Sequence, residues 1–292
     1  MAGVDGCTCD KEGESCARRM LRACRDVDEE LAHGAMLPDL RCPNLGATLA
    51  TRIQLCGPLA LRIDDRRVES ELPGRLGRLL VVYLVAHRQR EVPRCGLLSA
   101  LWPDDAPAAA DTSLSALLSK IRKTLGPERL EGRTSLRLRL PDGAWVDLEA
   151  AREGLHRAES AFARGDWFGV YGPGRVAQHV ATRGFLPGEN APWVVEVRAA
   201  LDEIHVRALE LVGAACVEIG GSEQNTADRC ARRLVELAPY RESGYRLLMR
   251  VLASRGNPAE GLLVYDELRR RLHEDLGVAP SLETQALHRS LL

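Results

Sequence analysis

The stretch that most constrains the fold is an amphipathic segment at residues 111–126, with the sequence DTSLSALLSKIRKTLG. Its large apolar residues recur at spacings of three and four, which is the period of an α-helix with one buried face. A glycine closes the segment at the position of a helix C-cap. The segment therefore predicts a helix that packs on a core through Leu114, Leu117, Leu118, Ile121 and Leu125.

The opposite side of this helix carries short polar side chains and ends in basic ones. It comprises Thr112, Ser115, Ala116, Ser119, Arg122 and Lys123, with Lys120 beside them. Small side chains let a helix approach a polyanionic groove closely, and basic side chains neutralise phosphates. The alternative is an ordinary solvated helix whose basic residues complement the helix dipole. The segments around the helix favour the first interpretation.

Sequence patterns on both sides of this helix predict a small sheet, two more helices and a hairpin. Apolar residues alternate over residues 51–68 around Gly-Pro and Asp-Asp turns, which is typical of antiparallel strands. Helices are expected over residues 73–87 and from Pro93 onward. Residues 128–140 predict a hairpin around Gly-Arg-Thr, in which the last five residues alternate leucine with arginine and give one apolar and one basic face. A sheet, three helices and a basic hairpin in this order indicate a winged helix.

Positive charge is concentrated in the same region. Residues 51–145 hold 16 Lys and Arg against 11 Asp and Glu, although the whole chain has a net charge of −1. The excess lies within residues 112–139, as expected for a surface that binds phosphates. The predicted DNA contacts are Thr112, Ser115, Ala116 and Ser119 to bases, Lys120, Arg122 and Lys123 to phosphates, and Arg133 and Arg137 from the hairpin.

This region resembles the OmpR-like DNA-binding domain of the Streptomyces antibiotic regulatory proteins, the AfsR-like SARP family. The likeness rests on LCGPLALRIDDRRV, GLLSALWPDD and SLSALLSKIRKTLGPERL, and above all on the helix end SKIRKTLG. The resemblance implies a recognition helix over residues 107–125 in the major groove, with the hairpin wing at residues 128–140 beside it. Thr112 and Ser115 stand where relatives often carry longer side chains, which shifts weight toward shape and phosphate contacts.

From residue 146 the pattern changes to helices that repeat at an offset of 34 residues. Such a period is typical of tetratricopeptide repeats, in which each unit buries its apolar face against its neighbours. Pro239 ends one unit, His273 stands at the matching place of the next, and residues 155–167 form a third, degenerate unit. The sequence GPGRV at residues 172–176 predicts a Gly-Pro turn. The matching pairs are Leu211 with Tyr245, Ala215 with Met249, Ala227 with Gly261, Ala231 with Tyr265, and Leu234 with Leu268.

This half resembles the bacterial transcriptional activator domain that follows the winged helix in the same family. The likeness is carried by VDLEAAREGLHRAESAFARGDW, by RRLVELAPYRESGYRLLMRVLASRGNPAEGLLVYDELRRRLHEDLGVAP and by ALHRSLL. The predicted fold class is mainly α with a small β part. A winged helix-turn-helix domain at residues 51–145 precedes a tetratricopeptide-like all-α domain at residues 146–292.

The resemblance implies a sequence-specific transcriptional activator that binds double-stranded DNA, at least there as a homodimer. It also implies a contact with RNA polymerase through the loop at residues 102–109. The helical domain is expected to bind a protein or a small ligand. The alternative function is a tetratricopeptide-like interaction adaptor whose winged helix binds DNA weakly or not at all. An adaptor would tolerate neutralisation of Lys120, Arg122 and Lys123.

The first 50 residues are expected to be a disordered or weakly ordered extension, or to be absent in part if translation starts at Met20 or Met36. Five of the nine cysteines lie here, and their spacing lacks the paired C-x2-C motifs of a strong zinc site. Reduced cysteines are expected, with a metal or redox site as the alternative. These cysteines are Cys7, Cys9, Cys16, Cys24 and Cys42.

Enzyme and membrane signals are missing from the sequence. It contains no P-loop, no G-x-G-x-x-G, no G-x-S-x-G and no H-E-x-x-H motif. We therefore expect no catalytic residue, no cofactor and no metal. The apolar runs are too short for a signal peptide or a membrane span, which favours a cytoplasmic protein with no membrane partner. An arginine-rich composition with three lysines is typical of an actinobacterial proteome.

Overall fold

The computed structural model describes residues 51–292, so the predicted extension over residues 1–50 and its cysteines lie outside the described residues. Close packing divides the described chain into two units. The first holds residues 51–152 and 179–205, and the second holds residues 153–178 and 206–292. Residues 179–205 therefore pack with the first unit, although the sequence analysis groups them with the later helices.

A four-stranded sheet opens the first unit, as the alternating apolar residues predict. β1 (Arg52–Gln54) pairs with β2 (Ala60–Ile63), and β2 pairs with β3 (Arg66–Arg67), both in antiparallel orientation. β7 (Trp145–Val146) returns to the other side of β1 and runs parallel to it. The sheet thus joins the beginning of the winged-helix region to its end.

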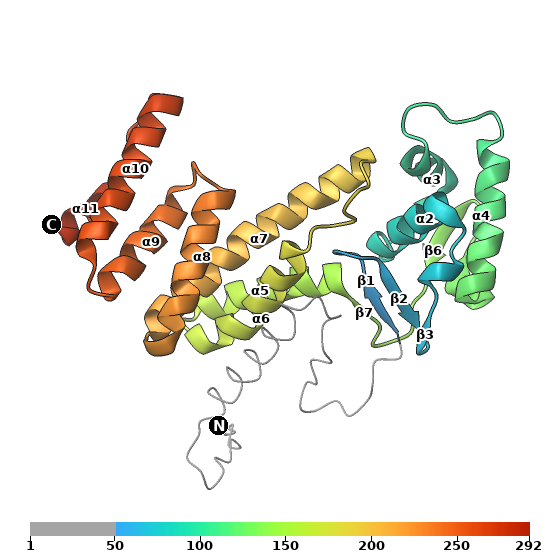
Figure 1. The fold of residues 1–292 in the computed structure, drawn as a ribbon. Coiled ribbons are helices and arrows are strands. Elements are labelled where there is room, and N and C mark those ends of the chain that lie inside the picture. Colours follow the sequence, from blue (N-terminus) through green and yellow to red (C-terminus); the bar gives the residue numbers. More distant parts are fainter. Residues whose placement is uncertain (1–50) are drawn as a thin grey trace, which may run out of the picture. The chain divides into compact units, whose positions relative to one another are not determined.

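Three helices and a second sheet, of three strands, complete the winged helix (Figure 1). The elements are η1 (Glu69–Glu71), α2 (Gly74–Ala86), β4 (Val92–Pro93), α3 (Arg94–Leu101), α4 (Ala110–Leu125), η2 (Pro127–Arg129), β5 (Leu130–Glu131) and β6 (Ser135–Leu138). α4 is the predicted amphipathic helix, and β5 and β6 form the predicted hairpin, here called the wing. β6 also pairs with β4, so the wing is anchored to the chain just before α3.

The apolar stripe of α4 lies in the core of the first unit. Leu114, Leu118 and Ile121 are at most 1% exposed, and the helix packs on α2 and α3. Full burial of such a side chain contributes about 1.5–3 kcal/mol. Burial of this stripe therefore determines which face of α4 remains outside, and that face is the one with the short polar and basic residues.

Three further helices contribute residues to both units: α5 (Asp147–Ala163), α6 (Trp167–Thr182) and α7 (Pro192–Ile219). Within the first unit, Asp147 is completely buried and its carboxylate accepts backbone N–H groups of Leu55 (2.9 Å), Cys56 (2.8 Å) and Leu148 (2.7 Å). This carboxylate fixes the residues that follow β1 to the first turn of α5.

Residues 179–205, the later segment of the first unit, pack on the winged helix through backbone and side-chain hydrogen bonds. The backbone N–H of Leu186 donates to Leu55 (3.2 Å), and the indole of Trp193 donates to the carbonyl of Ala100 (3.1 Å). Cys56 and Phe185 form an isolated antiparallel bridge. Residues 179–205 are thus part of the structure that supports the winged helix.

The second unit ends in four helices that pack on one another in chain order (Figure 1). They are α8 (Gln224–Leu237), α9 (Glu242–Ser254), α10 (Pro258–Leu276) and α11 (Leu282–Leu291), and η3 (Gly221–Glu223) precedes them. Every residue of the pairs related by the offset of 34 is buried. His273 lies within α10, which continues to Leu276 because no proline stops it as Pro239 stops the chain after α8.

The expected turn at residues 172–176 is wrong. α6 runs through this sequence, with Pro173 inside the helix. A Cβ on Gly174 would lie 2.6 Å from Cγ2 of Val212, and a Cβ on Gly154 would lie 2.7 Å from the carbonyl oxygen of Pro173. The glycines therefore let α5, α6 and α7 approach closely, and this packing outweighs the low helix propensity of glycine and proline.

Glu242 at the start of α9 holds the start of α11. Its carboxylate accepts the backbone N–H (3.0 Å) and the hydroxyl (2.7 Å) of Ser281, the N-cap of α11, and the hydroxyl of Thr284 (2.5 Å). Burial alone raises the pKa of Glu242, but the hydrogen bonds from Thr284 and Ser281, together with Arg246, hold this pKa below its usual value.

Replacing Glu242 with alanine is expected to release α11 and to lower the local free energy of unfolding by about 2 kcal/mol. Because the folded-state pKa is lowered, the wild-type carboxylate stabilises the protein above its unfolded-state pKa, and this contribution is lost as the pH falls. Hydrogen exchange of the α11 amides measures both effects. Arg289→Ala, at an exposed position of the same helix without a partner in the described chain, is the control, and equal exchange in the two variants would contradict the assignment.

Candidate nucleic-acid interface

The outer face of α4 matches the predicted reading face in most positions. Thr112, Ala116, Ser119, Lys120 and Lys123 are all exposed. Neither lysine forms a hydrogen bond or an ion pair with any residue between 51 and 292. The face thus combines small side chains, which permit close approach, with two positive charges that no described acid neutralises.

Two of the predicted residues lie instead along the edge of α4 that meets the wing. Ser115 and Arg122 are seven residues apart and so lie near one edge of the helix, in line with Asp111. The guanidinium of Arg122 donates to the backbone carbonyls of Leu130 (3.3 Å) and Gly132 (2.7 Å). Arg122 therefore holds the wing against α4.

The two predicted arginines of the wing have different surroundings. Arg133 is exposed in the turn between β5 and β6, and no residue of the described chain pairs with it. Arg137 is half-buried on β6, and its Nη2 lies 3.5 Å from the carbonyl of Gln89, while its Nε is buried without a hydrogen-bond partner. Arg133 is thus the wing residue that is available to a ligand.

Acidic residues near the end of α4 are each paired with an arginine. Arg129 pairs with Asp64 and lies 3.7 Å from Glu128, and Arg139 donates to Glu131 (3.0 Å). Lys120, Lys123 and Arg133 have no partner in the described chain, and Arg122 and Arg137 contact only backbone carbonyls, so no described acid neutralises any of these five cations. This arrangement favours a polyanionic ligand.

Sequence reasoning missed Arg94, the first residue of α3. Its guanidinium donates to the carboxylate of Asp111 (2.8 and 3.1 Å) and to the hydroxyl of Ser115 (2.9 Å), both on α4. Ser115 in turn donates to the backbone carbonyl of Asp111 (2.9 Å). A sequence signal existed, because a cation in the first turn of a helix opposes the helix dipole and calls for another partner.

Replacing Arg122 with alanine is expected to free the wing and to lower the free energy of unfolding by about 1–2 kcal/mol, because two carbonyls lose a charged donor. Arg122→Lys supplies one donor group in place of a two-armed fork and should restore only part of this loss. Hydrogen exchange in β5 and β6, together with urea unfolding, measures the effect. Unchanged wing exchange in both variants would refute the role.

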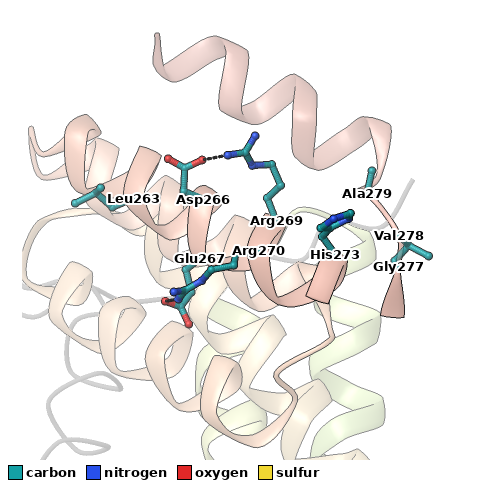
Figure 2. A pocket seen from close by; sticks show the side chains of 9 residues that line it. All are labelled: Leu263, Asp266, Glu267, Arg269, Arg270, His273, Gly277, Val278 and Ala279. Carbon is teal, nitrogen blue, oxygen red and sulfur yellow. Dashed lines mark hydrogen bonds and ion pairs between the residues drawn. The ribbon is translucent and has the colours of Figure 1, made fainter. Parts of the chain in front are cut away.

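A hollow of about 990 Å³ in the second unit is lined by α10 and the residues just after it, and Figure 2 shows the side chains of this lining. Leu263 and Val278 contribute apolar surface. Its charges are paired within the lining, since Arg269 pairs with Asp266 (3.2 Å) and Arg270 with Glu267 (3.1 Å). This hollow thus offers a ligand fewer unpaired groups than the face of α4.

Residues 51–292 hold neither a candidate metal centre nor a candidate membrane span. No group of three or more His, Cys, Asp or Glu side chains in this range is arranged to hold a metal ion. None of the described helices has the length and apolar content that crossing a membrane requires.

Comparison with known proteins agrees with this architecture. The bacterial transcriptional activator domain family matches residues 146–292. Regulatory protein AfsR of Streptomyces griseus is 27% identical over 277 residues, which cover 91% of this chain and 27% of that protein. Transcriptional regulatory protein EmbR of Mycobacterium tuberculosis is 27% identical over 267 residues, which cover 84% of this chain and 65% of that protein.

A solved structure of Mycobacterium tuberculosis EmbR in complex with a low affinity phosphopeptide has the same fold. The TM-score is 0.74 at 24% sequence identity, and the match covers 83% of this chain and 65% of that chain. The present chain therefore spans about a quarter of the length of AfsR and about two thirds of that of EmbR.

A winged helix followed by a tetratricopeptide-like helical array is thus a fold that this chain shares with the solved EmbR structure. The chain belongs to the bacterial transcriptional activator domain family and is similar to regulatory proteins of the AfsR-like SARP type.

Proposed function

We propose that the chain is a sequence-specific DNA-binding transcriptional activator, with α4 in the major groove and the wing beside it. The observation that carries this proposal is the set of three unpaired cations, Lys120, Lys123 and Arg133, around an exposed face of small side chains. Cations of this kind bind phosphates, and small side chains bring the helix close to the bases.

The proposed base contacts come from the middle of the exposed face. The hydroxyls of Thr112 and Ser119 can donate to or accept from base edges, and the methyl group of Ala116 can contact a thymine methyl. Ser115 is assigned a supporting part, since its hydroxyl already binds Arg94 and Asp111. Arg122 is assigned to hold the wing, and Arg137 is part of the wing. Both also retain N–H groups that can donate to a phosphate.

The remaining functional assignments follow from membership of the family. We assign the second unit to binding of a protein or small ligand, and the loop at residues 102–109 to contact with RNA polymerase. The protein is proposed to bind DNA as a homodimer in the cytoplasm. The homodimer on DNA and the contact with RNA polymerase share one premise, which is that the first unit binds DNA.

Fluorescence anisotropy with the full chain tests that premise. The probes are duplex DNA from the region upstream of the chain's own gene and a scrambled duplex of the same composition, each at several salt concentrations. We expect tighter binding to the native duplex and an affinity that falls steeply with salt. Equally weak, salt-insensitive binding to both duplexes would instead support the interaction adaptor.

A further inference from the structure

We propose that Arg94 reads a base pair in the DNA site and that Asp111 and Ser115 hold its side chain for this purpose. This assignment rests on the DNA-binding function proposed above. It adds a specificity-determining residue from outside the recognition helix, because Arg94 belongs to α3.

The side chain of Arg94 is held at several points. Nη2 donates to the carboxylate of Asp111 (2.8 Å), to the hydroxyl of Ser115 (2.9 Å) and to the backbone carbonyl of Asp111 (3.2 Å), and Nε donates to the same carboxylate (3.1 Å). The backbone N–H of Arg94 donates to the carbonyl of Thr134 in the turn of the wing, just before β6 (3.0 Å). Arg94 is thus fixed to α4 by its side chain and to the wing by its backbone.

One end of the guanidinium remains available. Arginine has five N–H donors, and Nη1 carries two of them. None of the hydrogen bonds that Arg94 makes within residues 51–292 uses Nη1. Ser115, which accepts from Nη2, lies one helical turn from Thr112 and Ser119, so the guanidinium is held at the edge of the proposed reading face. Guanine presents O6 and N7 side by side in the major groove, and arginine is their commonest partner.

The arrangement is a poor one for stability alone. The side chain of Asp111 is 70% exposed and that of Arg94 is 25% exposed, and ion pairs with one partner open to solvent contribute about 0–1 kcal/mol. An acid at this edge repels phosphates, and an arginine in the first turn of α3 opposes the helix dipole. Both features are explained if the pair presents a preoriented arginine, which loses less conformational freedom when it binds.

Selection of binding sites from random-sequence duplex DNA tests the assignment. Wild type, Arg94→Ala and the control Arg78→Ala are compared, because Arg78 is an exposed arginine of α2 without a partner in the described chain. We expect Arg94→Ala to lose discrimination at one G·C position by about tenfold or more, and to leave the other positions unchanged. Arg78→Ala should retain the full preference. Thermal unfolding of each variant confirms that it is folded.

Asp111→Asn provides a second test, in which the base preference should fall although the affinity for random DNA does not. Removing an acid beside a polyanion should maintain or raise the affinity for random DNA. The variant should nevertheless lose preference at the same G·C position as Arg94→Ala, because Arg94 is no longer held. A structural role of the Arg94–Asp111 pair alone would not change base preference at that position.

The outcomes separate this assignment from the general function. If the wild type selects no motif, the proposed DNA-binding function fails, and the role of Arg94 fails with it. If the wild type selects a motif that Arg94→Ala also selects, or if Arg94→Ala weakens binding to all sequences equally, the role of Arg94 alone is overturned. A uniform loss would identify Arg94 as a phosphate contact.

Discussion

Replacement of Asp147 with alanine is expected to lower the free energy of unfolding of the first unit by about 3–5 kcal/mol. The change leaves the backbone N–H groups of Leu55, Cys56 and Leu148 without their acceptor in the core. Asp147→Asn should cost nearly as much, because its amide nitrogen replaces an oxygen that accepts an N–H group. Urea unfolding followed by tryptophan fluorescence measures the loss, because three of the four tryptophans, Trp102, Trp145 and Trp193, lie in the first unit.

The control for this prediction is Asp142→Asn, which changes an exposed acid five residues earlier in the chain. Its free energy of unfolding should remain within about 0.5 kcal/mol of wild type. A loss of less than 1 kcal/mol for Asp147→Asn, on the same scale, would show that the carboxylate is replaceable.

The pH dependence of stability gives an independent view of Asp147. Burial raises the pKa of Asp147 from 3.8 to about 6, although the backbone hydrogen bonds from Cys56, Leu55 and Leu148 and the charge of Arg183 lower it. The folded state therefore binds a proton more tightly than the unfolded state. The stabilisation from this proton is fully present below about pH 4 and is lost as the pH rises through about 6.

Between those pH values the free energy of unfolding of wild type should fall by about 3 kcal/mol relative to Asp147→Asn, which does not titrate. Urea unfolding at intervals from pH 4 to pH 7 measures this difference. A difference that stays constant over the range would mean that the pKa of Asp147 is not raised.

Combined replacement of Lys120, Lys123 and Arg133 with alanine is expected to weaken DNA binding about 100-fold at 0.15 M salt. The slope of log affinity against log salt should become shallower by about three, since each lost phosphate contact means that one counterion fewer is released on binding. Each of these cations lacks an acid partner in the described chain, so its full charge is available to phosphate. Fluorescence anisotropy at several salt concentrations provides both quantities.

A charge-matched control uses three exposed arginines of the second unit, none of which pairs with a described residue: Arg157, Arg164 and Arg289. Their combined replacement with alanine removes the same net charge. Its salt slope should equal that of wild type. A similar loss in both triple variants would show that overall charge, and not the face of α4 with the wing, attracts DNA.

Sequence periodicity predicted the elements whose pattern is local. The spacing of Leu114, Leu118 and Ile121 gave the buried face of α4, and the offset of 34 residues located buried positions in α7 to α10. Helical and strand periods are carried by neighbouring residues, so one sequence suffices for them. The expected turn around Pro173 was wrong because distant side chains determine how closely α6 is packed.

The details of the candidate site depended on contacts between distant residues. Ser115 and Arg122 are on the predicted helix, but their partners come from α3 and from the wing. Nothing in residues 111–126 alone distinguishes an arginine that contacts solvent from one that binds a wing carbonyl. The base contact predicted for Ser115 and the phosphate contact predicted for Arg122 stay predictions. The base contact proposed for Arg94 is a third.

The pairing of β1 with β7 has a consequence for the order in which the protein is synthesised. Arg52 lies opposite Trp145, and residues 179–205 complete the same unit. During synthesis, β1 therefore leaves the ribosome well before β7 and residues 179–205, which complete the first unit. During that interval β1 keeps one unpaired edge, which nascent chains and chaperones can occupy. A shortened chain that ends at residue 145 would remain permanently in that incomplete state.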